Sequence, residues 1–131
     1  MQHEELKALA KVRFAHTLEA LSDAKILLEK ESYKGAANRS YYAAFHGMRA
    51  VLAFDEIDMK RHSGIISSFQ RLYIKTGIFP REISNMITTL FDVRSDSDYD
   101  DYYVVSKEKV TSQVENAEYF LGVIKSFIEK K

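Results

Sequence analysis

Residues 36–46 read AANRSYYAAFH, and this stretch decides the fold that the sequence predicts. It lies within residues 33–54, where apolar side chains recur every three or four positions, which predicts an amphipathic helix. Small side chains form a stripe along this helix: Ala36, Ser40, Ala43, Gly47 and Ala50. A stripe of this kind lets a second backbone approach closely. We expect either tight packing inside a helical bundle or a close dimer contact.

Apolar residues at the same spacing predict helices in the rest of the chain. Only one Pro and five Gly interrupt the 131 residues. We expect a first helix at about residues 3–30, with a buried face of Leu6, Ala10, Phe14, Leu18, Leu21 and Leu28. We expect a third helix that begins near His62 with Ser63 as its N-cap and ends before a left-handed Gly77.

Pro80 suits the first turn of a fourth helix, which we expect to reach about Arg94. The acidic segment at residues 95–103 does not favour its continuation, and a last helix is expected after Ser106. The sequence therefore predicts an all-α fold. We expect an antiparallel up-and-down bundle of four to five helices, forming a single domain over residues 1–131.

Composition excludes several kinds of protein but does not indicate a function. Nineteen basic and nineteen acidic residues cancel, and there is no Cys for disulfides or thiolate metal sites. No leader-like segment and no apolar run of about 20 residues is present, so we expect a cytoplasmic protein without a membrane span. Charge is nevertheless uneven. Residues 59–81 hold five basic residues and no acid, whereas residues 82–103 hold six acids and one base. These segments form a solvated surface, two patches that pair with each other, or a phosphate-attracting patch beside the third helix.

Common catalytic and cofactor motifs are absent. The sequence has no phosphate-binding loop, no dinucleotide fingerprint and no His-Glu-x-x-His metal motif. Asp96, Asp98 and Asp100 have the spacing of a calcium loop, but the pattern fails at Asp101 and Lys107, where Gly and Glu are needed. We therefore predict neither a metal site nor a cofactor.

Arg39 and His46 are the candidate catalytic pair, because seven residues place them on one helix face two turns apart. An imidazole can take a proton from a 2′-hydroxyl or give one to a leaving oxygen, and a guanidinium can hold the phosphate. One His provides only one of the two proton transfers of RNA cleavage. A second His is expected from His62 or from the His46 of a second copy. His3 and His16 have the pattern of ordinary surface residues.

These polar residues also allow purely structural interpretations. Arg39 could pair with an acid among residues 96–101. Arg94 continues the apolar stripe of the fourth helix, so it either forms an ion pair with Asp98 or lines a polar pocket with Arg39 and His46. Tyrosines could stack on bases or border the core: Tyr41, Tyr42, Tyr99, Tyr102 and Tyr103.

Three blocks in this order resemble the small stand-alone members of the HEPN domain family: residues 36–46, 62–64 and 94–99. The resemblance covers roughly residues 5–128. It implies an up-and-down helical bundle that commonly forms a homodimer. It also implies a link to RNA or nucleotides.

Many members of this family are metal-independent endoribonucleases built on an Arg, a polar residue, a short spacer and a His. Arg39, Ser40 and His46 match that pattern, with six residues between Arg and His. Some members are toxins encoded beside a small nucleotidyltransferase that acts as the antitoxin, in some systems by adenylylating a Tyr. In the well-understood toxins the motif lies on a late helix and a Tyr follows the His, whereas here it lies on the second helix and Gly47 follows.

The resemblance and the residue chemistry together predict a HEPN protein that binds nucleotide or RNA. It is expected to be a metal-independent ribonuclease toxin that acts with a small nucleotidyltransferase. Arg39 and His46 are its expected catalytic residues. The residues expected to bind substrate or brace the site are Asn38, Ser40, His62, Arg94 and Asp98. The alternative is a non-catalytic nucleotide- or protein-binding module that forms a dimer.

Overall fold

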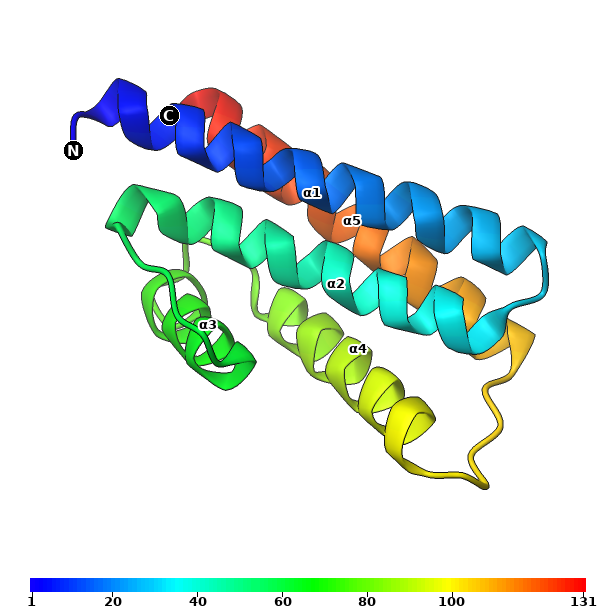
Figure 1. The fold of residues 1–131 in the computed structure, drawn as a ribbon. Helices are drawn as coiled ribbons and strands as arrows, with labels where there is room; N and C mark the ends of the chain where they lie inside the picture. Colours follow the sequence, from blue (N-terminus) through cyan, green and yellow to red (C-terminus); the bar gives the residue numbers. More distant parts are fainter.

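Five α-helices and no strand make up the computed structural model, which describes residues 1–131 (Figure 1). The helices are α1 (His3–Glu29), α2 (Tyr33–Leu52), α3 (His62–Phe69), α4 (Arg81–Tyr99) and α5 (Lys107–Lys130). A 3₁₀ turn at Ala53–Asp55 follows α2, and a π-helical turn at Gln70–Ile74 follows α3. The predicted all-α bundle is confirmed. None of the helices combines the length and the apolar character needed to cross a lipid bilayer.

Helix α2 lies at the centre of the bundle. It contacts all four other helices, with α1 and α5 on one side and α3 and α4 on the other (Figure 1). Helices α1 and α2 run antiparallel, and α5 returns beside both of them, so that the two ends of the chain meet. There the Nε2 atom of His3 lies 2.6 Å from the carbonyl oxygen of Lys131. Any residue on α2 is therefore near at least one other helix.

The small residues of α2 are buried within this chain. Ala36, Ser40, Ala43 and Ala50 have no exposed surface. A Cβ atom added to Gly47 would lie only 2.6 Å from Cδ1 of Ile124 on α5. The packing interpretation of the stripe is therefore confirmed. A dimer contact through it is wrong, because α1 and α5 already cover it.

The predicted helix ends are confirmed only in part, since α3 ends at Phe69 and not just before Gly77. The hydroxyl of Ser106 accepts a hydrogen bond of 3.1 Å from the backbone N–H of Lys109, so the predicted start of α5 is confirmed. Gly77 has the predicted left-handed backbone, with φ of 79°. Pro80 is the N-cap of α4 and not its first residue. Ser63 is not an N-cap, because α3 already begins at His62 after Arg61.

Two expectations about α1 and α4 are wrong. Helix α4 continues to Tyr99 because its buried face extends beyond Arg94. Val93 and Ser97 both lie on that face and are buried. The expected buried face of α1 is also displaced, since Leu18 is 51% exposed whereas Arg13 and Thr17 are buried. Helix α1 turns this face toward α2, where Arg13 finds polar partners.

Candidate functional site

Arg39 and His46 line one small cavity between α1 and α2. Its volume is about 160 Å³, and its walls are His16, Glu19, Ala20, Asp23, Arg39 and His46. His16, Glu19 and Asp23 share one face of α1 because they are three, four and seven residues apart. The polar face of α1 therefore meets the polar face of α2, and both candidate catalytic side chains are half-buried at this junction.

The guanidinium of Arg39 forms no ion pair. Its Nε and Nη2 atoms donate hydrogen bonds of 3.1 and 2.7 Å to Oδ1 of Asn38. Its Cζ atom lies 4.9 Å from the centre of the Tyr42 ring, a cation–π distance. The structural interpretation that paired Arg39 with the acids at residues 96–101 is therefore wrong. Asn38 and Tyr42 orient Arg39 while its charge stays available to an anion.

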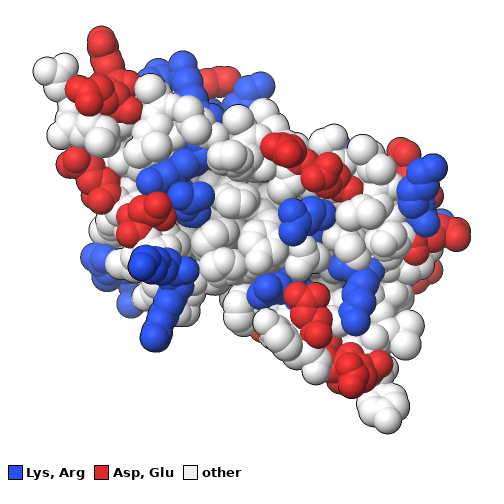
Figure 2. All heavy atoms as spheres, viewed as in Figure 1, with Lys and Arg blue, Asp and Glu red and all other residues white.

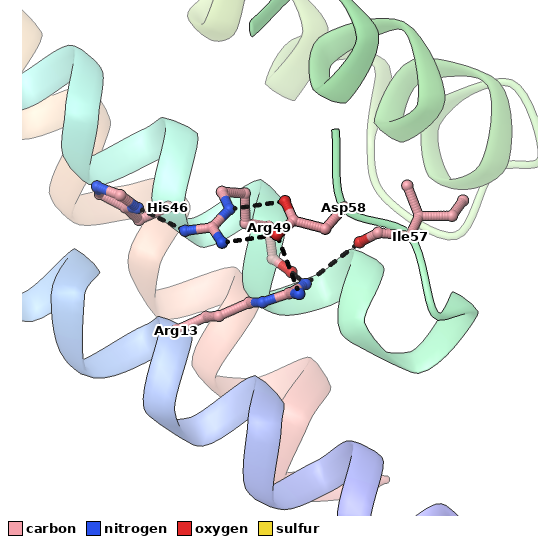
Figure 3. A network of polar contacts seen from close by, with 5 residues as sticks. All are labelled: Arg13, His46, Arg49, Ile57 and Asp58. Carbon is pink, nitrogen blue, oxygen red and sulfur yellow. Dashed lines mark hydrogen bonds and ion pairs between the residues drawn. The ribbon is translucent and has the colours of Figure 1, made fainter. Parts of the chain in front are cut away.

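His46 is held in its neutral form. Nη1 of Arg49 lies 3.4 Å from Nδ1 of His46, and only the arginine can donate (Figure 3). The pKa of His46 falls from 6.5 to about 4, mainly through burial, with further contributions from Arg49, His16, Arg39 and His62. At neutral pH the ring therefore carries its proton on Nε2 and presents a lone pair at Nδ1.

Arg49 is fixed beside His46 by a network at the end of α2 (Figure 3). Its Nε and Nη2 atoms donate to the two carboxylate oxygens of Asp58 at 3.2 and 3.1 Å. Arg13 is 9% exposed, donates to the carbonyl oxygens of Arg49 and Ile57, and lies 3.6 Å from Asp58. The hydrogen bond from Arg49 lowers the pKa of Asp58. This network presents one guanidinium nitrogen of Arg49 to His46.

His62 lies on the other side of α2, in an aromatic cluster with Tyr41 and Phe45. Its ring stacks on Phe45 with centroids 4.0 Å apart, and Nδ1 lies 2.8 Å from the hydroxyl of Tyr41. Burial raises the pKa of Tyr41 to about 12, so this hydroxyl stays protonated beside His62. Burial and Arg94 lower the pKa of His62. His62 does not line the cavity of Arg39 and His46.

Arg94 links α4 to this cluster and to Tyr42. Its Nε atom lies 3.0 Å from Oδ2 of Asp98, an ion pair without the alignment of a hydrogen bond. Its Nη2 atom donates to the hydroxyl of Tyr42 at 3.4 Å, and its Cζ atom lies 5.2 Å from the centre of the Tyr41 ring. Arg94 therefore pairs with Asp98, as one interpretation predicted, and does not line the cavity of Arg39 and His46, as the other predicted. It contacts that site only through Tyr42, the ring that Arg39 also contacts.

Of the predicted site residues, Arg39 and His46 line the cavity, whereas Asn38, Ser40, His62, Arg94 and Asp98 do not. Ser40 is the one that points into the core. Its hydroxyl is fully buried and donates to the carbonyl oxygen of Ala36 at 2.9 Å within α2. Sequence reasoning also missed His16 and Arg49. Arg49 extends the face of Arg39 and His46 by one more turn, so helical spacing could have identified it. His16 comes from another helix, and no sequence signal marks its contact with α2.

Charged side chains of both signs surround an uncharged area on the face that α2 crosses (Figure 2). Residues 59–81 and 82–103, the basic and the acidic segment, form no ion pair with each other. Their expected mutual pairing is therefore wrong. No three His, Asp or Glu side chains lie together in a way that could hold a metal ion.

Comparison with known proteins places these features in a family. The HEPN domain matches residues 10–127. A "UPF0332 protein" of Thermotoga maritima is 35% identical over 111 residues, which cover 85% of this chain and 84% of that protein. A protein of Methanocaldococcus jannaschii with the name "Putative toxin MJ0605" is 32% identical over 127 residues, or 97% of this chain and 91% of that protein. A second protein from that organism, "Putative toxin MJ0142", is 30% identical over 112 residues, which cover 86% of this chain and 76% of that protein. The chain belongs to the HEPN domain family.

Proposed function

We propose that this HEPN protein is a metal-independent endoribonuclease that acts as a toxin. The observation that carries the proposal is the shared cavity of Arg39 and His46, in which Arg39 has no carboxylate partner. An unpaired guanidinium beside a neutral imidazole can bind a phosphodiester. The same arrangement contributes little to the stability of the fold, which points to a functional role. The toxin role is supported by the names of the two relatives from Methanocaldococcus jannaschii.

In this proposal Arg39 holds a nonbridging oxygen of the scissile phosphate and offsets the charge that develops on it. His46 accepts the proton of the adjacent 2′-hydroxyl at Nδ1, where its lone pair lies. The hydroxyl replaces Arg49 at that nitrogen. Asp58 continues to hold Arg49, so that its Nη1 atom turns to the phosphate. Asn38 and Tyr42 position Arg39.

Two partners complete the proposal. A homodimer and a small nucleotidyltransferase antitoxin are both implied by the family resemblance. Light scattering would give the molar mass of the purified protein, and co-expression with a neighbouring nucleotidyltransferase gene would show whether growth is restored. A monomer that cleaves RNA would remove the dimer from the proposal and leave the chemistry intact.

The direct test is RNA cleavage by the purified protein in the presence of a metal chelator. His46→Ala should reduce the rate by about 10²- to 10⁴-fold, the usual range for loss of a proton-transfer group. Arg39→Ala should reduce it comparably because the phosphate loses its ligand. The matched controls are His3→Ala, at the far end of the bundle, and Arg71→Ala, an exposed arginine beyond α3.

Three outcomes are informative. Cleavage lost in both cavity variants and kept in both controls supports the proposal. Cleavage that survives in His46→Ala contradicts it. No cleavage by the wild type, together with a higher melting temperature in the presence of nucleotide, would instead indicate a non-catalytic binding module.

A further inference from the structure

A second imidazole lies opposite His46 in the same chain. The ring centres of His16 and His46 are 5.7 Å apart, with 42° between their planes, and both rings line the cavity of Arg39. His16 comes from α1, forms no hydrogen bond, and is exposed. Its position is set by the packing of α1 against α2, which buries the neighbouring Thr17 and Ala20.

His62 is unsuited to the role of the second imidazole. Its Nδ1 atom is engaged by Tyr41, its ring is stacked on Phe45, and it lines a different hollow, with Asp58 and Lys60. His16, by contrast, lines the same cavity as His46 and comes from the same chain.

We propose that His16 is the general acid of the RNA cleavage reaction and gives its proton to the 5′-oxygen of the departing nucleotide. This inference rests on the proposed function, which it deepens by assigning the second proton transfer. The two rings differ in their surroundings: His46 is half-buried on α2, whereas His16 lies on the exposed face of α1 and is open to solvent.

The proton balance of the reaction closes within this pair. The 2′-oxygen attacks phosphorus as its proton passes to Nδ1 of His46. The bond between phosphorus and the 5′-oxygen breaks, and the 5′-oxygen takes the proton from His16. The products are a 2′,3′-cyclic phosphate and a 5′-hydroxyl, and solvent restores both imidazoles. Four charged groups surround His16 and His46 in this cavity and beside it: Glu19, Asp23, Arg39 and Arg49.

The test separates an acid from a structural residue by changing the leaving group. An RNA dinucleotide needs a proton on its leaving 5′-oxygen. A uridine 3′-phosphodiester of 4-nitrophenol does not, because nitrophenolate departs unprotonated. We expect His16→Ala to lower cleavage of the dinucleotide by at least about 10²-fold and cleavage of the nitrophenyl ester by less than about threefold. His46→Ala should lower both rates, and His3→Ala neither.

His16 is exposed, so His16→Ala and His16→Gln should both keep the wild-type melting temperature, which is measured alongside. Equal losses on the two substrates in both variants would overturn the assignment of His16 as the acid. Wild-type rates on both substrates would overturn any role for His16 while leaving the proposed function intact. A wild-type protein inactive on both substrates would overturn the proposed function, and the role of His16 with it.

Discussion

The two faces of α2 differ in what they require from the sequence. One face carries only small side chains, is fully buried, and packs against α1 and α5. The other carries Arg39, Tyr42, His46 and Arg49, which are all half-buried. The small face requires side chains of limited volume, whereas the polar face requires particular chemical groups. A single helix can therefore hold the fold together and present a reactive site.

The polar face of α2 contributes less to the stability of the fold than the small face does. On the small face, the side chains fill the space between helices. On the polar face, Arg39 forms no ion pair, and burial together with nearby cations disfavours the protonation of His46. Groups that oppose stability in this way persist where they serve another purpose. Rigid packing on the first face keeps these groups in place on the second.

The largest effect is expected from filling the small face. Gly47→Leu should lower the free energy of unfolding by about 3 kcal/mol, because its side chain would overlap Ile124, which is fully buried. Urea denaturation followed by circular dichroism measures the change. Gly122→Ala on α5 is the matched control, since its Cβ would meet nothing within 4 Å. It should stabilise the protein by about 1 kcal/mol through helix propensity.

If Gly47→Leu were as stable as the wild type, the small face would not be a packing surface. The contrast between the two faces would then be lost. A change confined to the polar face, such as Arg39→Ala, should leave the free energy of unfolding within about 0.5 kcal/mol of the wild type.

The second effect is a pH dependence that originates on the polar face. The pKa of His46 is about 4 in the folded protein, and its ordinary value of 6.5 applies to the unfolded chain. Between these values the unfolded chain binds a proton that the folded chain does not, so stability falls as the pH falls. From pH 7.5 to 5 the loss should reach about 2 kcal/mol. Denaturation at pH 7.5 and pH 5 should show this loss in the wild type and much less of it in His46→Gln.

His3→Gln serves as the control for this measurement, because His3 lies at the exposed end of the bundle. A loss as large in His46→Gln as in the wild type would mean that His46 titrates normally. The polar face would then be an ordinary solvated surface.

The sequence predicted the helices well because each depends on local signals. The spacing of apolar residues located all five helices, and Ser106 located the start of α5. The errors arose where a neighbouring helix decides. Leu18 is apolar but points away from α2, while Arg13 is buried because two carbonyl oxygens at the end of α2 accept its hydrogen bonds. Periodicity cannot foresee a partner that is distant in the sequence.

The candidate site was predictable only within one helix. Arg39 and His46 share a face by spacing, and the structure shows that they also share a cavity. Ser40 was included because of its place in a motif, but one step along a helix turns a side chain by about 100°, in this case into the core. His16 was taken for a surface residue because nothing local reveals which helix lies opposite it. Contacts between helices were the missing information.

A smaller effect is expected from Asp58, which anchors Arg49 on the polar face. Asp58→Asn should lower the free energy of unfolding at pH 7 by no more than about 1 kcal/mol, because the carboxylate is 49% exposed and water screens the pair. Since its pKa is lowered from 3.8 in the folded protein, this contribution is present above about pH 4. It disappears as the pH falls through the lower folded value. Denaturation at pH 7 and pH 3, with Asp92→Asn as the exposed control, should show a larger difference at pH 7 than at pH 3.

The smallest effect concerns the acids that α1 contributes to the cavity. Glu19 and Asp23 line it opposite Arg39 and should repel a bound phosphate. Glu19→Gln should therefore tighten binding of a 2′-deoxy oligonucleotide, which cannot be cleaved, by about two- to fivefold at low salt. The gain should fade as salt screens the charges. Fluorescence anisotropy at two salt concentrations measures it, with Glu129→Gln near the chain end as the control. An equal gain from the control would show that only the net charge of the protein matters. A gain specific to Glu19 would place the phosphate in the cavity between the polar faces of α1 and α2.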